Sequence, residues 1–148
     1  VQLCNQWGVS ILKTDPIGVG AGVTARLKEL SDEGVLKATV CGVNFAEKAN
    51  NTDMFAIKRD EVLYGLADRF RDNEIDLSAI QDSEELFSQL VSIKKDKPTS
   101  KGQLKVAKKD HSNSPDRADS LALAFGIVKE STVSVIFDDI REFPDDDD

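Results

Sequence analysis

The chain has 148 residues, of which 40% are hydrophobic and 31% charged, a composition that fits one globular domain with its own core. No apolar run approaches the roughly 20 residues that span a membrane, and no basic segment followed by an apolar one indicates secretion. Cys4 and Cys41 lack metal-ligand spacing and fit a reducing cytoplasm. The net charge of -8 argues against a surface that is basic throughout.

The charge is distributed unevenly along the chain. Residues 138–148 carry seven acids and one arginine, a net charge of -6, which leaves -2 on residues 1–137. We therefore predict a domain over 1–137 and an acidic, disordered tail over 138–148. Basic side chains gather in one stretch, at Lys94, Lys95, Lys97, Lys101, Lys105, Lys108 and Lys109. This stretch is either a local nucleic-acid surface or a solvated hairpin, and the residues alone favour the hairpin.

The first half of the chain predicts a βαβ unit. Residues 9–12 form a strand candidate, and a Gly-rich turn at 17–22 opens a helix that runs to about Glu33. A second strand is predicted over 35–43. Strand, helix and strand in this order make the two strands parallel.

The second half predicts helices that flank a hairpin. Amphipathic spacing indicates helices over 58–72 and 82–90. Strand candidates at 91–95 and 103–107 are joined through a flexible tip at 98–102. The fold class is therefore α/β.

A last helix begins near Ser114 and carries two carboxylates. Ser114 suits the N-cap position and Pro115 the first helical position. Asp116 and Asp119 are three residues apart and share one face of the helix. Asp116 is explained by the helix dipole, whereas Asp119 lies a turn further in and needs a partner. A divalent metal is one candidate partner, and a capped, solvated helix start is the alternative.

Asp15 follows the first strand, where ligands collect in open α/β sheets. The glycines behind it, Gly18, Gly20 and Gly22, match neither a P-loop nor a dinucleotide fingerprint. They indicate close packing of strand on helix, whereas Asp15 is well placed to hold a metal. His111 is the only histidine, which disfavours a hydrolase triad.

Three segments together resemble the nuclease domain of phage terminase large subunits. Asp15–Val23 (DPIGVGAGV) is similar to the family's D-x-x-G-x-G-x-G-V segment, and Ser114–Leu121 (SPDRADSL) to its S-P-D-x-A-D-A-L helix. Phe55–Leu63 (FAIKRDEVL) resembles the middle helix of the family. Lys108 or Lys109 resembles a lysine that follows the family's last hairpin.

The resemblance implies a partial ribonuclease H-like fold: a parallel βαβ core with flanking helices and a C-terminal hairpin. It further implies an endonuclease that uses two divalent ions, Mg²⁺ or Mn²⁺, to cut concatemeric double-stranded viral DNA. Asp15 would be the second acid of the site, and Asp116 or Asp119 the third. Lys105, Lys108 and Lys109 would contact the DNA.

The implied partners are the ATPase domain, the small terminase subunit and the portal, in the cytoplasm of a bacterial host. The chain departs from the family pattern because the early strand with the first catalytic Asp is absent before Asp15, as is a Walker A motif. We therefore expect a C-terminal part of a large subunit, either a cloned fragment or a truncated prophage product, which need not be active alone. The alternatives are an inactive or DNA-holding remnant of the same fold, another ribonuclease H-like enzyme, and a protein-binding module with an acidic tail.

Overall fold

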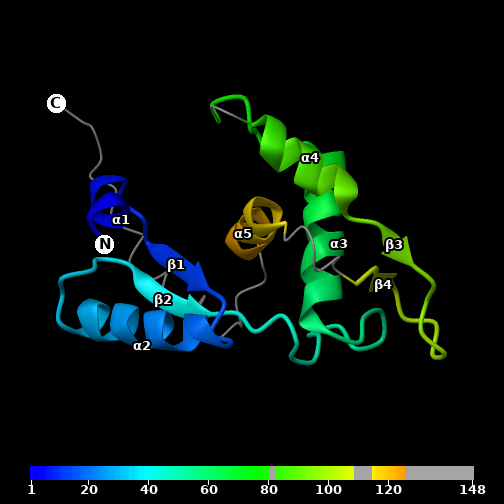
Figure 1. The fold of residues 1–148 in the computed structure, drawn as a ribbon, viewed down its shortest axis with the longest axis horizontal. Coiled ribbons are helices and arrows are strands. Elements are labelled where there is room, and N and C mark those ends of the chain that lie inside the picture. The colour runs from blue at the N-terminus through cyan, green and yellow to red at the C-terminus, as the bar shows by residue number, and fades with distance from the viewer. Residues whose placement is uncertain (81–82, 109–114, 126–148) are drawn as a thin grey trace, which may run out of the picture.

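A computed structural model of the chain describes residues 1–80, 83–108 and 115–125. The described residues form helices and short strands (Figure 1). In chain order the elements are α1 (Gln2–Gln6), β1 (Ile11–Thr14), α2 (Val19–Asp32), β2 (Thr39–Gly42), α3 (Lys58–Arg71), α4 (Glu84–Ser92), β3 (Lys95–Asp96), β4 (Lys105–Val106) and α5 (Asp116–Phe125).

The βαβ unit predicted from the sequence is present. β1 pairs with β2 in parallel, with Ile11 opposite Thr39. One side of α2 packs on this pair and closes a small apolar core, which consists of Leu36, Ala38 and Val40 with Leu12, Leu27 and Leu30 around them. Leu27 and Leu30 of α2 face this core, whereas Val23 in its first turns is 54% exposed.

A second core forms between α3, β4 and α5. The predicted helix over 58–72 is confirmed within one residue as α3. Its apolar face follows the helical period and is buried. The cluster consists of Val62, Leu63, Leu66, Val106 and Ala122.

The hairpin is shorter than the sequence predicts. The strand expected over 91–95 is wrong because α4 continues through Ser92, whose hydroxyl donates to the carbonyl of Gln89 at 2.6 Å. β3 therefore has two residues, and Lys95 pairs with Val106 in an antiparallel register. The short helix α1 had no sequence prediction. The predicted cap at Ser114 and the predicted tail at 138–148 lie outside the described residues.

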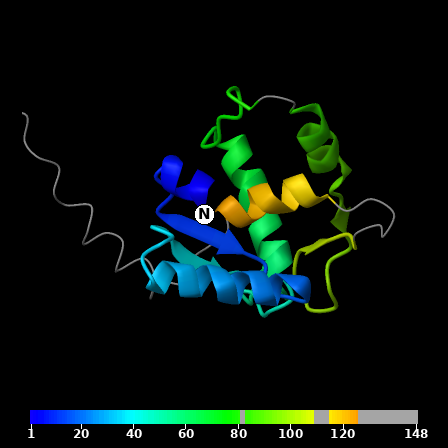
Figure 2. The ribbon, with the colours of Figure 1, turned by 60° about the vertical axis from the view of Figure 1, so that its left-hand side comes forward.

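α5 bridges the two halves of the molecule. It lies between the β1–β2 pair and α3 in Figure 1, crosses α3 in the turned view of Figure 2, and contacts β1, α3 and α4. Ala118 and Ala122 have no exposed surface, so their small side chains let α5 approach its neighbours closely. Among the described residues, no helix is long and apolar enough to cross a membrane.

Candidate functional site

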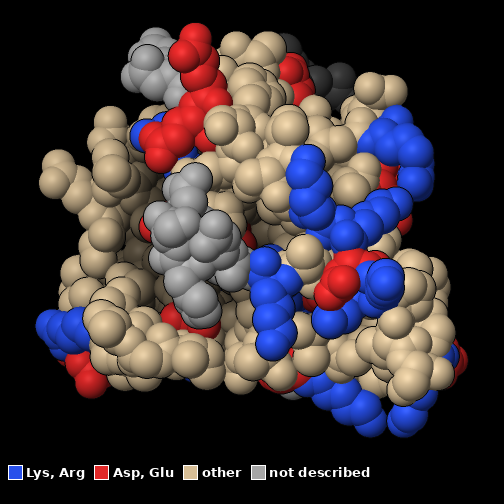
Figure 3. Space-filling model, turned by 45° about the vertical axis from the view of Figure 1, so that its right-hand side comes forward, with Lys and Arg blue, Asp and Glu red and all other residues tan. Residues whose placement is uncertain are grey.

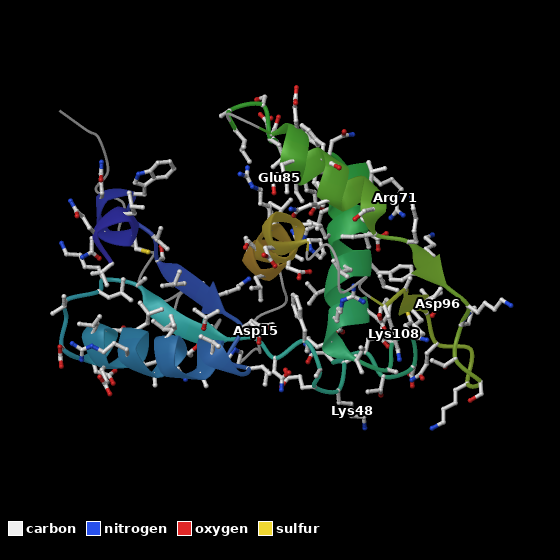
Figure 4. All side chains as sticks on the ribbon, viewed as in Figure 1. Asp15, Lys48, Arg71, Glu85, Asp96 and Lys108 are labelled. Atoms are coloured by element: carbon white, nitrogen blue, oxygen red, sulfur yellow. The ribbon has the colours of Figure 1, made fainter. Side chains whose placement is uncertain are left out.

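Asp15 lies directly after β1, at the carboxyl end of the parallel strand pair (Figure 4). Its side chain is exposed, and Oδ1 accepts a hydrogen bond from the N–H of Ile17 at 3.1 Å. An aspartate that bonds the backbone two residues on stabilises a tight turn. The carboxylate is therefore held by the turn and remains open to solvent on its exposed side.

The glycines behind Asp15 pack helix α2 onto the end of β1. Gly18 has a φ of +60°, in the region that side chains disfavour. A Cβ on Gly20 would overlap the carbonyl oxygen of Asp15, whereas a Cβ on Gly22 would meet open space. The interpretation of the glycines as close packing of strand on helix is confirmed at Gly20.

The other two predicted acids lie in the first turn of α5. Asp116 is exposed, whereas Asp119 is half-buried and its Oδ1 atom is buried. The N–H of Asp119 donates to the carbonyl of Pro115 at 2.8 Å, which is the first helical hydrogen bond of α5.

The far end of α5 lies against β1. Lys13 donates a hydrogen bond from Nζ to the carbonyl oxygen of Ala124 at 2.9 Å. A cation at the last turn of a helix complements the helix dipole. Burial lowers the pKa of Lys13, the nearby Arg69 acts in the same direction, and Cys41 opposes the shift. Lys13 precedes Asp15 by two residues, so the hydrogen bond to Ala124 connects the last turn of α5 to the strand that leads to the predicted acid.

The described residues do not bring the three acids together as a metal cluster. Within them, no group of three or more His, Cys, Asp or Glu side chains could hold one ion. The donors are carboxylate oxygens, which suit Mg²⁺ and Mn²⁺. Their chemistry fits such an ion, but the described residues do not supply a complete ligand set. The assignment of Asp15, Asp116 and Asp119 as metal ligands stays a prediction.

The basic stretch forms an exposed surface at the hairpin. Lys and Arg side chains gather on the face seen in Figure 3. Lys97, Lys101 and Lys108 are exposed. Lys105 pairs with Asp96 at 2.8 Å, and a side-chain hydrogen bond to Asp96 raises the pKa of Lys105. The charge of Lys105 is therefore partly compensated, and its role toward DNA stays a prediction, as does that of Lys108.

Two residues at the start of α3 hold the strand that leads to Lys108. Asp60 is buried, and its Oδ1 accepts the N–H of Val106 at 3.0 Å. Arg59 donates to the carbonyl of Ala107 at 3.1 Å. The two side chains bond the backbone on consecutive residues and so direct the chain toward Lys108. Sequence reasoning gave neither residue a role, because nothing in the sequence shows which backbone groups they reach. Lys109 lies outside the described residues.

An ionic network is buried beside this contact. Lys58 and Glu61 are paired at 3.1 Å, and their side chains are 3% and 4% exposed. Glu61 also accepts the N–H groups of Asn50 and Asn51, each at 2.8 Å. Burial is the largest influence on the pKa of Glu61 and raises it, but these N–H groups and Lys58 together outweigh burial and lower it. The network ties the loop between β2 and α3 to the first turn of α3.

The arrangement resembles solved nuclease structures. One structure of the nuclease domain of the large terminase subunit of bacterial virus Sf6, a lysine-to-alanine mutant with manganese and beta-thujaplicinol, superposes with a TM-score of 0.70. The match is 23% identical and covers 86% of this chain and 70% of that one. This chain has the fold of a terminase nuclease domain. A second structure of the same mutant with manganese gives a TM-score of 0.69 at 24% identity, with the same coverage.

These matches confirm the predicted fold class. The parallel pair, the flanking helices and the hairpin before α5 belong to a ribonuclease H-like nuclease fold. No family model matches the chain, and no curated protein matches it by sequence. The resemblance identified from Asp15–Val23 and Ser114–Leu121 is therefore supported by the fold.

Proposed function

We propose that the chain is the nuclease domain of a viral DNA-packaging terminase, which hydrolyses phosphodiester bonds of concatemeric double-stranded DNA. The observation that carries this proposal is the terminase nuclease fold, found in a chain with one motif segment directly after β1 and the other in the first half of α5. The matched viral domain was solved with manganese, which supports a divalent ion as the cofactor. We extend this to two ions, Mg²⁺ or Mn²⁺, which would activate water and stabilise the leaving oxygen when bound.

The side chains of this chain would hold and orient the reaction components. Asp15 would supply oxygen ligands from the end of β1, and Asp119, or Asp116 beside it, from α5. Lys108 and Lys109 would contact the DNA phosphates and offset the repulsion between phosphate and carboxylate. Asp60 and Arg59 would keep Lys108 in place through the backbone of Val106 and Ala107.

The partners follow from the same proposal. They are double-stranded viral DNA, the ATPase domain of the large subunit, the small terminase subunit and the portal, in the cytoplasm of a bacterial host. Further carboxylates would complete the ligand set, since no three acids of the described residues gather around one ion.

The second candidate is a remnant of the same fold that holds DNA, or only has a structural role, without cutting. The lack of a three-acid cluster in the described part of the chain favours it. The basic hairpin surface suits DNA in both cases, so the two candidates differ in metal binding and not in DNA binding.

Calorimetric titration of the 148-residue chain with Mn²⁺ tests the proposal. We expect binding by the unaltered chain and at least a tenfold loss of affinity in Asp15→Asn/Asp119→Asn, because both ligand groups lose their charge. The control is Asp32→Asn/Asp53→Asn, which removes two exposed carboxylates elsewhere and should bind as the unaltered chain does.

The controls separate the possible outcomes. Equal loss in both double variants would indicate a general effect of charge and remove Asp15 and Asp119 from the site. No binding by the unaltered chain would favour the DNA-holding remnant.

A further inference from the structure

Gln89 joins α4 to the helix that carries the two acids. It is 8% exposed, and its Oε1 accepts the backbone N–H groups of Arg117 at 2.9 Å and of Ala118 at 3.1 Å. The first N–H groups of a helix have no partner within the helix itself. Gln89 therefore caps the N-terminus of α5 from a neighbouring helix. In most helices the capping side chain instead belongs to the N-cap residue of the same helix.

The capping side chain is itself held in place. Gln89 donates from Nε2 to Oε1 of Glu85 at 3.2 Å, one turn earlier in α4. Glu85 in turn pairs through Oε2 with the guanidinium of Arg117 at 3.0 Å, and Figure 4 shows it on the side of α4 toward α5. The three side chains and the N–H of Arg117 close a ring across the two helices. A ring of this kind restrains the first turn of α5 both along the helix axis and in rotation about it.

The capped residues lie between the two predicted ligands. Arg117 and Ala118 are flanked by Asp116 and Asp119, and a helix turns about 100° per residue. A small rotation of α5 would therefore change the position of the Asp119 carboxylate. Lys13 holds the opposite end of the helix through Ala124, whereas Gln89 and Glu85 contact the turn that carries the acids.

We propose that Gln89 is a positioning residue, which sets the place of the Asp119 carboxylate for metal binding. This rests on the proposed function, because it takes Asp119 as a ligand. Groups that orient metal ligands are worth about 10–100-fold in metal affinity in other proteins. Gln89 acts here through the helix backbone and not through the carboxylate itself.

The test compares three variants of the full chain by two measurements. Gln89→Leu removes the cap, Glu85→Gln/Gln89→Glu keeps both an oxygen acceptor at position 89 and a hydrogen bond between positions 85 and 89, and Leu36→Val perturbs the other core. The measurements are Mn²⁺ affinity by calorimetry and amide hydrogen exchange of Arg117 and Ala118 by nuclear magnetic resonance.

We expect Gln89→Leu to weaken Mn²⁺ binding about tenfold and to speed exchange of both amides relative to that of Ala122. Glu85→Gln/Gln89→Glu should retain amide protection and most of the affinity, because the acceptor and the hydrogen bond that holds it are both kept. Leu36→Val should change neither measurement, although it lowers the midpoint of unfolding.

Unchanged Mn²⁺ affinity in Gln89→Leu, in a chain that does bind Mn²⁺, would overturn the positioning role and leave the proposed function standing. Unchanged exchange at Arg117 and Ala118 would overturn it as well, because the cap would then have no effect on α5. If the unaltered chain bound no Mn²⁺, the proposed function would fail, and the positioning role would fail with it.

Discussion

Glu61 shows how a buried charge is kept in this fold. The carboxylate has three partners, the ammonium of Lys58 and the N–H groups of Asn50 and Asn51. A buried ion pair is stable only when its remaining lone pairs are also bonded. The two backbone bonds supply this, and they explain why the pKa of Glu61 lies below its usual value despite burial.

We expect Glu61→Gln to lower the free energy of unfolding by about 3 kcal/mol at neutral pH, because Lys58 is left buried without its counter-charge. The control is Glu84→Gln on the exposed first turn of α4, which should have a small effect. Urea unfolding measures both. If Glu61→Gln lowered the free energy of unfolding no more than Glu84→Gln does, the pair of Lys58 and Glu61 would contribute no net stability.

The same residue gives a pH dependence with a definite sign. A carboxyl group whose pKa is lower in the folded state makes its full contribution to stability at a pH above its pKa in the unfolded state, which is about 4.3 for glutamate. That contribution is lost as the pH falls through the lower folded pKa. Glu61→Gln has no such group, so its stability should fall less than that of the unaltered chain on acidification through this window. Parallel acid dependences of the two proteins would contradict the lowered pKa.

At the scale of elements, the turn after β1 offers a matched pair of glycines. Gly20→Ala should destabilise the chain by roughly 1–3 kcal/mol, because the new Cβ overlaps the carbonyl of Asp15 and must displace backbone. Gly22→Ala has open space around its Cβ and should stabilise α2 by about 1 kcal/mol through helix propensity. Opposite signs in urea unfolding are the expected result, and equal stabilisation by both would show that α2 does not pack closely on Asp15.

The elements that the sequence predicted well are those set by local patterns. The helix of Lys58–Arg71 and the parallel βαβ unit follow from apolar spacing and from the glycines after Asp15. The end of α4 was missed because Val91 suits a strand by composition, whereas the helix continues through Ser92, whose hydroxyl bonds the carbonyl of Gln89. Gln89 could not be found from the sequence, because its partners lie 28 and 29 residues away.

The sequence proposes residues for the candidate site but not the distances between them. Asp15 and Asp119 were chosen because each acid stands at a strand end or a helix start. Whether carboxylates from the end of β1 and from α5 meet depends on how α5 crosses between the two cores, to which the contacts of Lys13 and Gln89 contribute. Neither contact has a local sequence signal, so the distances within the site were beyond sequence reasoning.

At the scale of the whole molecule, charge separates the hairpin from the rest of an acidic chain. The net charge is -8, yet the exposed lysines Lys97, Lys101 and Lys108 lie on or beside one hairpin. A local basic surface binds phosphates even when the total charge repels them, since salt screens distant charges over about 10 Å at 0.1 M ionic strength. DNA should therefore bind through the hairpin face and not through the βαβ half.

Two double variants with the same change in net charge distinguish a local surface from total charge. We expect Lys101→Gln/Lys108→Gln to weaken binding to a DNA duplex and to reduce the salt slope of the affinity by about 1 for each lysine that contacts a phosphate. Lys28→Gln/Lys37→Gln removes two exposed lysines from the βαβ half and should leave the slope unchanged. Fluorescence anisotropy at several salt concentrations measures both slopes. Equal slopes for the two variants would assign binding to total charge, whereas a fall confined to the hairpin variant would place the DNA beside Lys108, on the strand held by Arg59 and Asp60.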